Sequence, residues 1–308
     1  MNTNFHPWLY RFACLLAGAT FLLIVAGANV TSHRAGLSVP DWPTTYGQFM
    51  FSFPMSKWVG NILYEHGHRL IASVVGILTI ILAVWLVRVE PRRWVRRLGI
   101  AALAVVIVQG ILGGLTVKLM LPPPVSIAHA CLAEAFFCIT VALAFVTSQE
   151  WRQPALPVQI STARLAQRFI LASTIAVYAQ VILGATVRHA EWGIFAHIFG
   201  AAVVFGCVIW SLLAALYTVK HRGFLRHAIL LLCLVAAQLV LGLVALIVRT
   251  PKNVDEGLSA VQVLVPTAHL ALGALVLATS LVMTMKAFRF LATPGEEPSW
   301  PMVPGAVS

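Results

Sequence analysis

Eight apolar segments of about 20 residues each recur along this chain of 308 residues. A helix needs about 20 apolar residues to cross a hydrocarbon core of roughly 30 Å, and a helix satisfies its backbone hydrogen bonds internally. We therefore predict an all-α, polytopic membrane protein. The eight predicted spans cover roughly residues 11–31, 67–88, 97–117, 126–147, 167–187, 194–217, 227–248 and 263–285.

Charge supports this class and sets an orientation. Only 10% of the residues are charged and 60% are hydrophobic, too few polar groups to cover a soluble domain. The net charge of +11 would suggest nucleic acid in a soluble protein. With the amino terminus inside, however, 14 of the 21 Lys and Arg residues fall on the inner side and 7 on the outer. The positive-inside rule then predicts a multi-pass protein of the cell inner (cytoplasmic) membrane, with both termini cytoplasmic and no nucleic-acid partner.

The first span and the cysteines raise two questions about processing and redox chemistry. Ala26-Gly27-Ala28 resembles a signal-peptidase site, but we expect the first span to be retained because the repeat described next uses it. The five cysteines all lie within predicted spans, and the chain has no CxxC motif. The pattern therefore predicts neither a disulfide framework nor a cysteine zinc site.

Two short motifs repeat along the chain. Gln-x-x-Leu-Gly occupies residues 109–113, 180–184 and 238–242, and Ala-His opens the next span each time, at residues 128–129, 196–197 and 268–269. The first two spans keep only Gly27 and His68 of this pattern. The repeating unit is a helical hairpin used four times. We predict two pseudo-symmetric four-helix bundles, 1–150 and 160–308, related by an axis along the membrane normal.

One histidine per hairpin lies at the same end of each even-numbered span. Facing side chains are how helix bundles build cofactor sites, and two facing imidazoles suit the two axial positions of a haem iron. Zinc usually requires three or four converging ligands, and each bundle offers two histidines. We therefore predict two iron-binding pairs, His68 with His129 and His197 with His269.

Other repeated residues have two readings each. Gly113, Gly184 and Gly242 would leave room for a flat macrocycle or allow close helix packing. The glutamines of the motif, Gln109, Gln180 and Gln238, would serve the site or form interhelical hydrogen bonds. Four cations follow the odd-numbered spans, where they would bind haem propionates or reach the membrane interface. They are Arg34, Lys118, Arg188 and Arg249.

Glu65 has no counterpart in the other hairpins. It precedes His68 by three residues and so shares a helix face with it. A carboxylate there would accept or relay a proton, or orient the imidazole. His66 points to another side of the helix, where we expect it at the interface, and Glu134 is a second, weaker buried candidate.

The first outer connection, about residues 32–64, is the longest between spans. Its length and its two prolines around an aspartate and a tryptophan favour a rigid lid over an outward-facing site. A plain connector is the alternative.

Together these features resemble the haem A synthase family over about residues 10–290. The resemblance rests on the eight spans and on motifs that occur in order along the chain. The motifs are Gly36-Leu37-Ser38-x-Pro40-Asp41-Trp42-Pro43, Glu65-x-x-His68-Arg69, and His129, His197 and His269 on the even-numbered spans.

The resemblance implies an enzyme that converts haem O to haem A for terminal cytochrome oxidases. The C8 methyl of haem O would be oxidised to a formyl group by two successive hydroxylations. A haem b cofactor would bind to His197 and His269 in the carboxy-terminal half. Substrate haem O would bind at His68 and His129, with Glu65 catalytic. Some family members carry a cysteine pair in the first outer loop, and this chain has none there.

The chain has no flavin or nicotinamide fingerprint, so we expect an external electron donor. Haem O synthase, cytochrome oxidase subunits and further copies of the chain are the other expected partners. The alternative function is a bis-histidine dihaem cytochrome that carries electrons without catalysis, and a haem carrier is a third. The electron carrier gives Glu65 no necessary role, and the haem carrier would need reversible binding without turnover.

Overall fold

A computed structural model describes residues 5–152, 158–219, 222–248 and 258–294. Within these residues, eight helices are long and apolar enough to cross a membrane, which confirms the predicted all-α, multi-pass class. The long helices are α1 (Pro7–Ser32), α2 (Asn61–Val89), α3 (Arg93–Lys118), α4 (Pro123–Thr147), α6 (Ala163–Ala190), α7 (Ile194–Leu213), α8 (Arg222–Ile247) and α9 (Ala260–Phe290).

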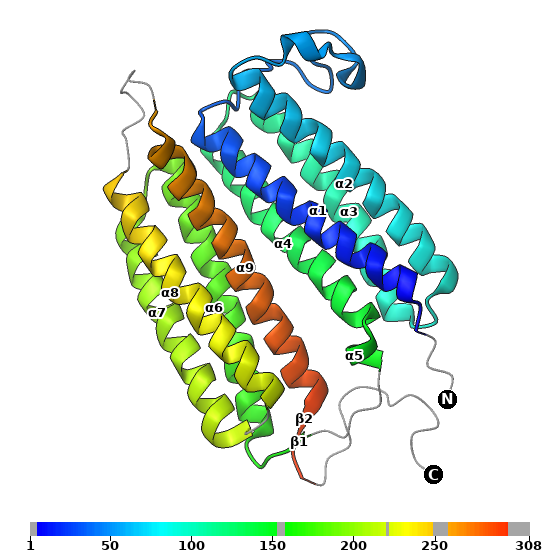
Figure 1. The fold of residues 1–308 in the computed structure, drawn as a ribbon, viewed down its shortest axis with the longest axis vertical. Coiled ribbons are helices and arrows are strands. Elements are labelled where there is room, and N and C mark those ends of the chain that lie inside the picture. The colour runs from blue at the N-terminus through cyan, green and yellow to red at the C-terminus, as the bar shows by residue number, and fades with distance from the viewer. Residues whose placement is uncertain (1–4, 153–157, 220–221, 249–257, 295–308) are drawn as a thin grey trace.

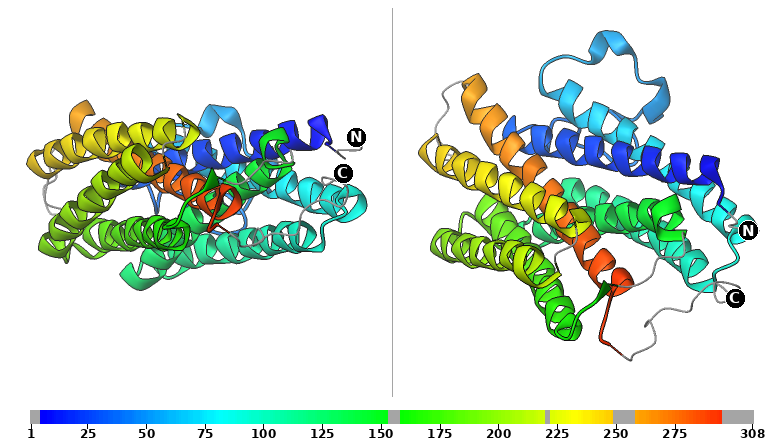
Figure 2. Two further views of the ribbon diagram at one scale, coloured as in Figure 1. Left: turned by 90° about the horizontal axis from the view of Figure 1, so that it is seen from below. Right: turned by 60° about the horizontal axis from the view of Figure 1, so that its bottom comes forward.

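The helices fall into two groups of four (Figure 1). Helices α1, α2, α3 and α4 pack in a closed ring of neighbours, and α6, α7, α8 and α9 form a second ring. The groups meet where α1 and α4 of the first pack against α6 and α9 of the second. Figure 2 shows α9 running between the two groups.

Short elements complete the described chain. A turn of helix, α5 (Gln149–Arg152), follows α4, and α7 continues into a π-helical turn, η3 (Ala214–Val219). The strands β1 (Val158–Gln159) and β2 (Leu291–Ala292) pair in parallel and tie the start of α6 to the end of α9. Two 3₁₀ turns, η1 (Met50–Ser52) and η2 (Met55–Lys57), lie in the connection between α1 and α2.

Helix ends follow ordinary local rules. Pro7 starts α1 and Pro123 starts α4, where the missing N–H of proline costs no intrahelical bond. A capping box between Ser259 and Gln262 starts α9. Pro266 lies inside that helix near its start.

The apolar core of each group lies toward one end of the helices. In the first group it includes Leu9 and Leu16 early in α1, Leu86 late in α2 and Leu143 late in α4. The second core likewise uses the start of α6 and α8 and the end of α7 and α9. All four predicted histidines lie in the other half of the helices, which we call the histidine end. It is the end at which α2, α4, α7 and α9 begin.

Candidate functional site

Each of the four histidines lies against a glycine of the preceding long helix. A Cβ atom added to Gly27 would lie 3.0 Å from Cε1 of His68, a distance tighter than ordinary contact. The same contact recurs in every hairpin. It measures 3.0 Å for Gly113 and His129, 3.1 Å for Gly184 and His197, and 3.0 Å for Gly242 and His269.

This contact changes the interpretation of the glycines. Their positions in the sequence were compatible with room for a macrocycle or with close helix packing, whereas in the structure each glycine makes room for the edge of an imidazole ring. Any larger side chain at these positions would push the ring away. The glycines therefore fix where the histidine side chains lie.

The histidines lie in two pairs. The rings of His197 and His269 are neighbours in the second group, with centroids 6.3 Å apart and planes inclined by 80°. In the first group, His68 and His129 lie close enough to interact electrostatically. The topology thus brings together the two pairs that the repeats suggested.

The geometry of the second pair suits a shared metal between the rings. Two imidazoles that ligate one metal from opposite sides, each with a bond of about 2 Å, place their ring centroids about 6 Å apart. Three of the histidines, His68, His129 and His269, also have a buried Nδ1 with no hydrogen-bond partner among the described residues. A buried polar atom without a partner is costly. A bound haem would use these imidazole rings as ligands of its iron.

Among the described residues, no group of three or more His, Cys, Asp or Glu side chains lies close enough to hold a metal ion. Each pair therefore offers two protein ligands. That number fits the axial positions of a haem iron, because the macrocycle supplies the remaining ligands.

The motif glutamines hold the histidine helices in place. Nε2 of Gln109 donates to the carbonyl of His129 at 3.0 Å, and Nε2 of Gln180 donates to the carbonyl of His197 at 2.7 Å. Gln180 Nε2 also lies 3.0 Å from Nδ1 of His197. Each glutamine precedes its glycine by four residues, so both face the same neighbouring helix. These contacts confirm interhelical hydrogen bonding for Gln109 and Gln180.

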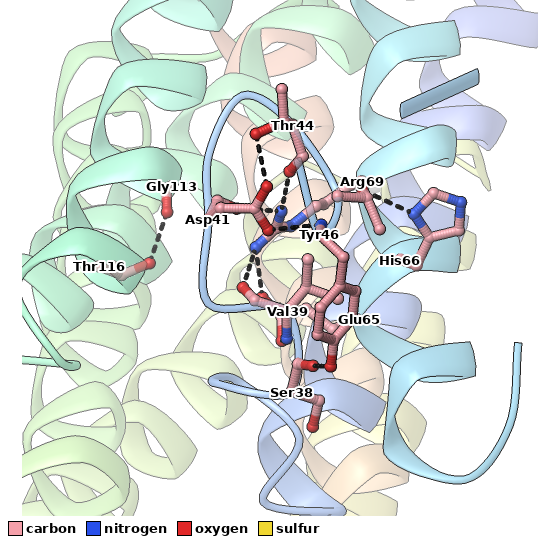
Figure 3. Close-up of polar contacts among 11 residues, drawn as sticks. Ser38, Val39, Asp41, Thr44, Tyr46, Glu65, His66, Arg69, Gly113 and Thr116 are labelled. Carbon is pink, nitrogen blue, oxygen red and sulfur yellow. Dashed lines mark hydrogen bonds and ion pairs between the residues drawn. The ribbon is translucent and has the colours of Figure 1, made fainter. Parts of the chain in front are cut away.

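Glu65 is buried at 3% exposure and both of its carboxylate oxygens have partners (Figure 3). Arg69, one turn later in α2, donates to Oε1 at 2.6 Å, and the backbone N–H of Val39 donates to Oε2 at 2.7 Å. The carboxylate therefore binds a cation of its own helix and the backbone of the long connection at the same time.

Arg69 binds the same connection between α1 and α2. Its guanidinium donates to three backbone carbonyls, those of Val39 at 2.7 Å, Asp41 at 2.7 Å and Thr44 at 3.1 Å. In the sequence, Arg69 is part of the Glu65-x-x-His68-Arg69 motif, and no role is predicted for it. Its spacing of four residues from Glu65 was the available signal, because such pairs meet on a helix surface.

His66 is not at the interface, so that prediction is wrong. The side chain is fully buried, at 0% exposure. Its Nδ1 lies 3.1 Å from the hydroxyl of Thr45, and its ring packs against Phe53 and Trp58. The helical spacing placed it correctly on another face from His68, but that face is covered by the folded connection between α1 and α2.

The four cations predicted to follow the odd-numbered spans lie in different surroundings. Arg188, in the last turn of α6, donates to the carbonyl of Ala28 at 3.0 Å and to the hydroxyl of Ser32 at 2.8 Å. Lys118 is the exposed last residue of α3. Arg34 follows α1 in the left-handed region of backbone conformation, at φ 55°. Arg249 lies outside the described residues.

Glu134 is buried at 6% exposure in α4. Its Oε2 has no hydrogen-bond partner among the described residues. The hydroxyl of Tyr178 in α6 donates nearby, to the carbonyl of Cys131 at 3.1 Å. Glu134 thus lies about one turn of α4 from a contact between the two groups.

Fold and site together define a polytopic helical membrane protein with two histidine pairs at one end. A family model described as "Cytochrome oxidase assembly protein" matches residues 48–196. The chain is 28% identical to the "Heme A synthase" of Symbiobacterium thermophilum, over 75% of this chain and 84% of that protein. It is 25% identical to that of Geobacillus kaustophilus, over 79% and 82%. The alignment with the Alkalihalophilus pseudofirmus protein, at 24% identity, covers 60% of this chain and 61% of the relative.

The matched segment of the family model runs from the long connection through both α2 and α4 into α7. It therefore contains Glu65, Arg69 and two of the four histidines, His68 and His129. Over most of its length the chain is thus similar to proteins named "Heme A synthase".

Proposed function

We propose that this protein is a haem A synthase, an integral membrane enzyme that oxidises the C8 methyl of haem O to a formyl group for cytochrome oxidase biogenesis. The first hydroxylation gives a hydroxymethyl group, and the second gives a gem-diol that loses water. The observation that carries the proposal is the pair of histidines in each helix group, each ring seated on a glycine. The relatives named "Heme A synthase" support the choice of reaction.

The two pairs take different roles in this proposal. His197 and His269 hold a haem b cofactor, which would supply one-electron transfer when bound. His68 and His129 hold the substrate haem O. What supports this division is the Glu65–Arg69 pair, which belongs to the first group, one turn from His68. The boundaries 1–150 and 160–308 for the two units belong to the same proposal.

Glu65 is the residue proposed to serve the reaction directly. It lies three residues before His68 on α2 and so shares a helix face with it. Its carboxylate oxygens accept hydrogen bonds from Arg69 and Val39. These contacts hold the carboxylate in one orientation, a requirement for a group that accepts or relays a proton.

The surroundings follow from the same proposal. The protein would lie in the cell inner (cytoplasmic) membrane with both termini in the cytoplasm and the histidine end facing outward. Electrons would come from an external donor. Haem O synthase, cytochrome oxidase subunits and a second copy of the chain are the proposed protein partners.

The decisive experiment is expression in a host that makes haem O and lacks its own synthase, followed by analysis of the extracted haems. We expect haem A together with some hydroxylated intermediate. A well-folded protein that produces neither would overturn the proposal.

Glu65→Ala separates the enzyme from a dihaem cytochrome that only carries electrons. We expect the variant to keep its bound haem and to lose haem A formation. An electron carrier would instead keep both its haem spectrum and its electron transfer, because that function gives Glu65 no task.

A further inference from the structure

Trp42 lies flat against α3 at Gly114. A Cβ atom added to Gly114 would lie 2.5–2.7 Å from three atoms of the indole ring, so the ring rests directly on the helix backbone. Gly114 follows Gly113, the glycine that seats His129. The indole is thus held one residue from the seat of a proposed substrate ligand. It is 36% exposed, so part of it faces outward from the helices.

The backbone around Trp42 is fixed to α2. Arg69 donates to the carbonyls of Val39, Asp41 and Thr44, which lie on both sides of Trp42 in sequence. Figure 3 shows Arg69 reaching across to this loop while it contacts Glu65. Trp42 therefore joins α2 to α3 at the histidine end. The loop backbone around it is hydrogen-bonded to α2, and its indole packs against α3.

The loop is also organised from within. The Asp41 carboxylate accepts hydrogen bonds from the hydroxyl of Thr44 and from the backbone N–H groups of Tyr46, at 2.7 Å, and Gly47, at 2.8 Å. The hydroxyl of Tyr46 donates to the carbonyl of Ser38 at 2.6 Å. This turn presents Trp42 in one position. In the second group, the connection between α6 and α7 consists only of residues 191–193.

We propose that Trp42 caps the first histidine pair and retains the singly hydroxylated haem between the two oxidations. This inference rests on the proposed function. A reaction with two oxidations at one carbon gives its final product only if the hydroxymethyl haem stays bound until the second step. Trp42 is a positioning residue here, because it acts by closing the mouth of the site beside His129.

The experiment measures the ratio of hydroxymethyl haem to haem A in cells that express the full chain and make haem O. Trp42→Ala should raise this ratio several-fold, and Trp42→Phe should restore it toward the wild-type value. Gly114→Ala, which displaces the indole, should also raise it. Gly110→Ala on the same helix is the matched control, since nothing lies within 4 Å of a Cβ added there.

The ratio distinguishes a cap from a residue that only stabilises the fold. Loss of folded protein lowers both products together and leaves their ratio unchanged. An unchanged ratio in Trp42→Ala and Gly114→Ala, with both variants folded to the wild-type level and an active wild type, would overturn the cap alone. Absence of both products from wild-type cells would overturn the proposed function and the cap with it.

Discussion

At the residue scale, the contact between glycine and histidine sets the position of all four candidate ligands. The ring of each histidine approaches the backbone of the preceding helix so closely that even a methyl group would press on it. Repetition of the contact in four hairpins, despite different neighbouring side chains, indicates that ring position is what the repeat preserves in this chain.

A large side chain at one of these glycines should displace its histidine. We expect Gly184→Leu to move His197 and to lower the amount of haem that purifies with the protein, at an overpacking cost of about 1–3 kcal/mol. The haem-to-protein absorbance ratio measures this. Gly206→Leu in α7 is the control, because a Cβ there has nothing within 4 Å. Equal haem content in both variants would contradict the role of Gly184.

The histidine positions could be predicted from sequence because the repeat marked them four times. The partners of Glu65 could not, since Val39 and Thr44 come from a connection without periodicity. His66 shows the same limit. Spacing gave its helix face correctly, but whether that face met lipid or a folded loop depended on contacts 21 residues apart in the chain.

At the element scale, hydropathy located every spanning helix and misplaced several ends. Helix α2 was expected from residue 67 and begins at Asn61, because Glu65 and His66 are polar but buried. Helix α9 was expected over 263–285 and covers Ala260–Phe290, extended at its start by the Ser259 capping box. Polar residues inside a helix lower its mean hydropathy, so the predicted span stops short of them. The hydrogen bonds that allow these residues to be buried form only in the folded chain.

The turn between α2 and α3 contains a buried ion-pair network. Glu90, at 2% exposure, accepts from Arg92 at 2.7 Å and also binds Arg152 in α5, and Arg92 donates to the carbonyl of Val146 at the end of α4. Burial pushes the pKa of Glu90 up, but the hydrogen bonds and charges of Arg92 and Arg152 outweigh it and hold the pKa below its ordinary value.

Glu90→Ala should therefore lower the free energy of unfolding by about 3 kcal/mol, because it leaves two partly buried cations without their carboxylate. Thermal unfolding in detergent measures the loss. Arg93→Ala in the same turn is the control: Arg93 is exposed, so we expect a change within about 0.5 kcal/mol. A similar loss in both variants would contradict the assignment.

The pKa direction of Glu90 also fixes a pH dependence. Since the folded-state pKa is lower than the ordinary value of about 4.3, the carboxylate stabilises the fold at every pH above that value. The contribution is lost as the pH falls through the lower, folded-state pKa. Unfolding temperatures of the wild type and Glu90→Ala should therefore stay apart from pH 8 to pH 6 and converge below about pH 4.

At the scale of the whole molecule, polar contacts cross between the two helix groups. At the histidine end, Arg188 of α6 binds Ala28 and Ser32 of α1, and the hydroxyl of Ser32 lies 2.9 Å from that of Thr267 in α9. The sequence places Arg188 after a predicted span. That its side chain reaches the other helix group could not be predicted, because contacts between the two groups produce no repeating pattern in the sequence.

Arg188→Met should weaken this junction by about 2–3 kcal/mol, the loss expected for hydrogen bonds made by a charged group. Thermal unfolding and the haem content of the purified protein measure the change. Lys118→Met is the matched control, since Lys118 also follows a long helix but is exposed, and we expect a change within about 0.5 kcal/mol. Equal stability of the two variants would rule out the junction as a stabilising contact.

Polar contacts join the two helix groups at three levels along the helices. Besides Arg188, the Tyr178 hydroxyl of α6 donates to the Cys131 carbonyl of α4. At the opposite end, Lys286 of α9 pairs with Glu150 of α5 at 2.6 Å, beside the Arg289 contact with the carbonyl of Trp151. The separation of the histidine pairs is therefore set by the fold and not by a hinge between the groups. An electron that passes from one proposed haem site to the other would therefore cross the same distance at every turnover.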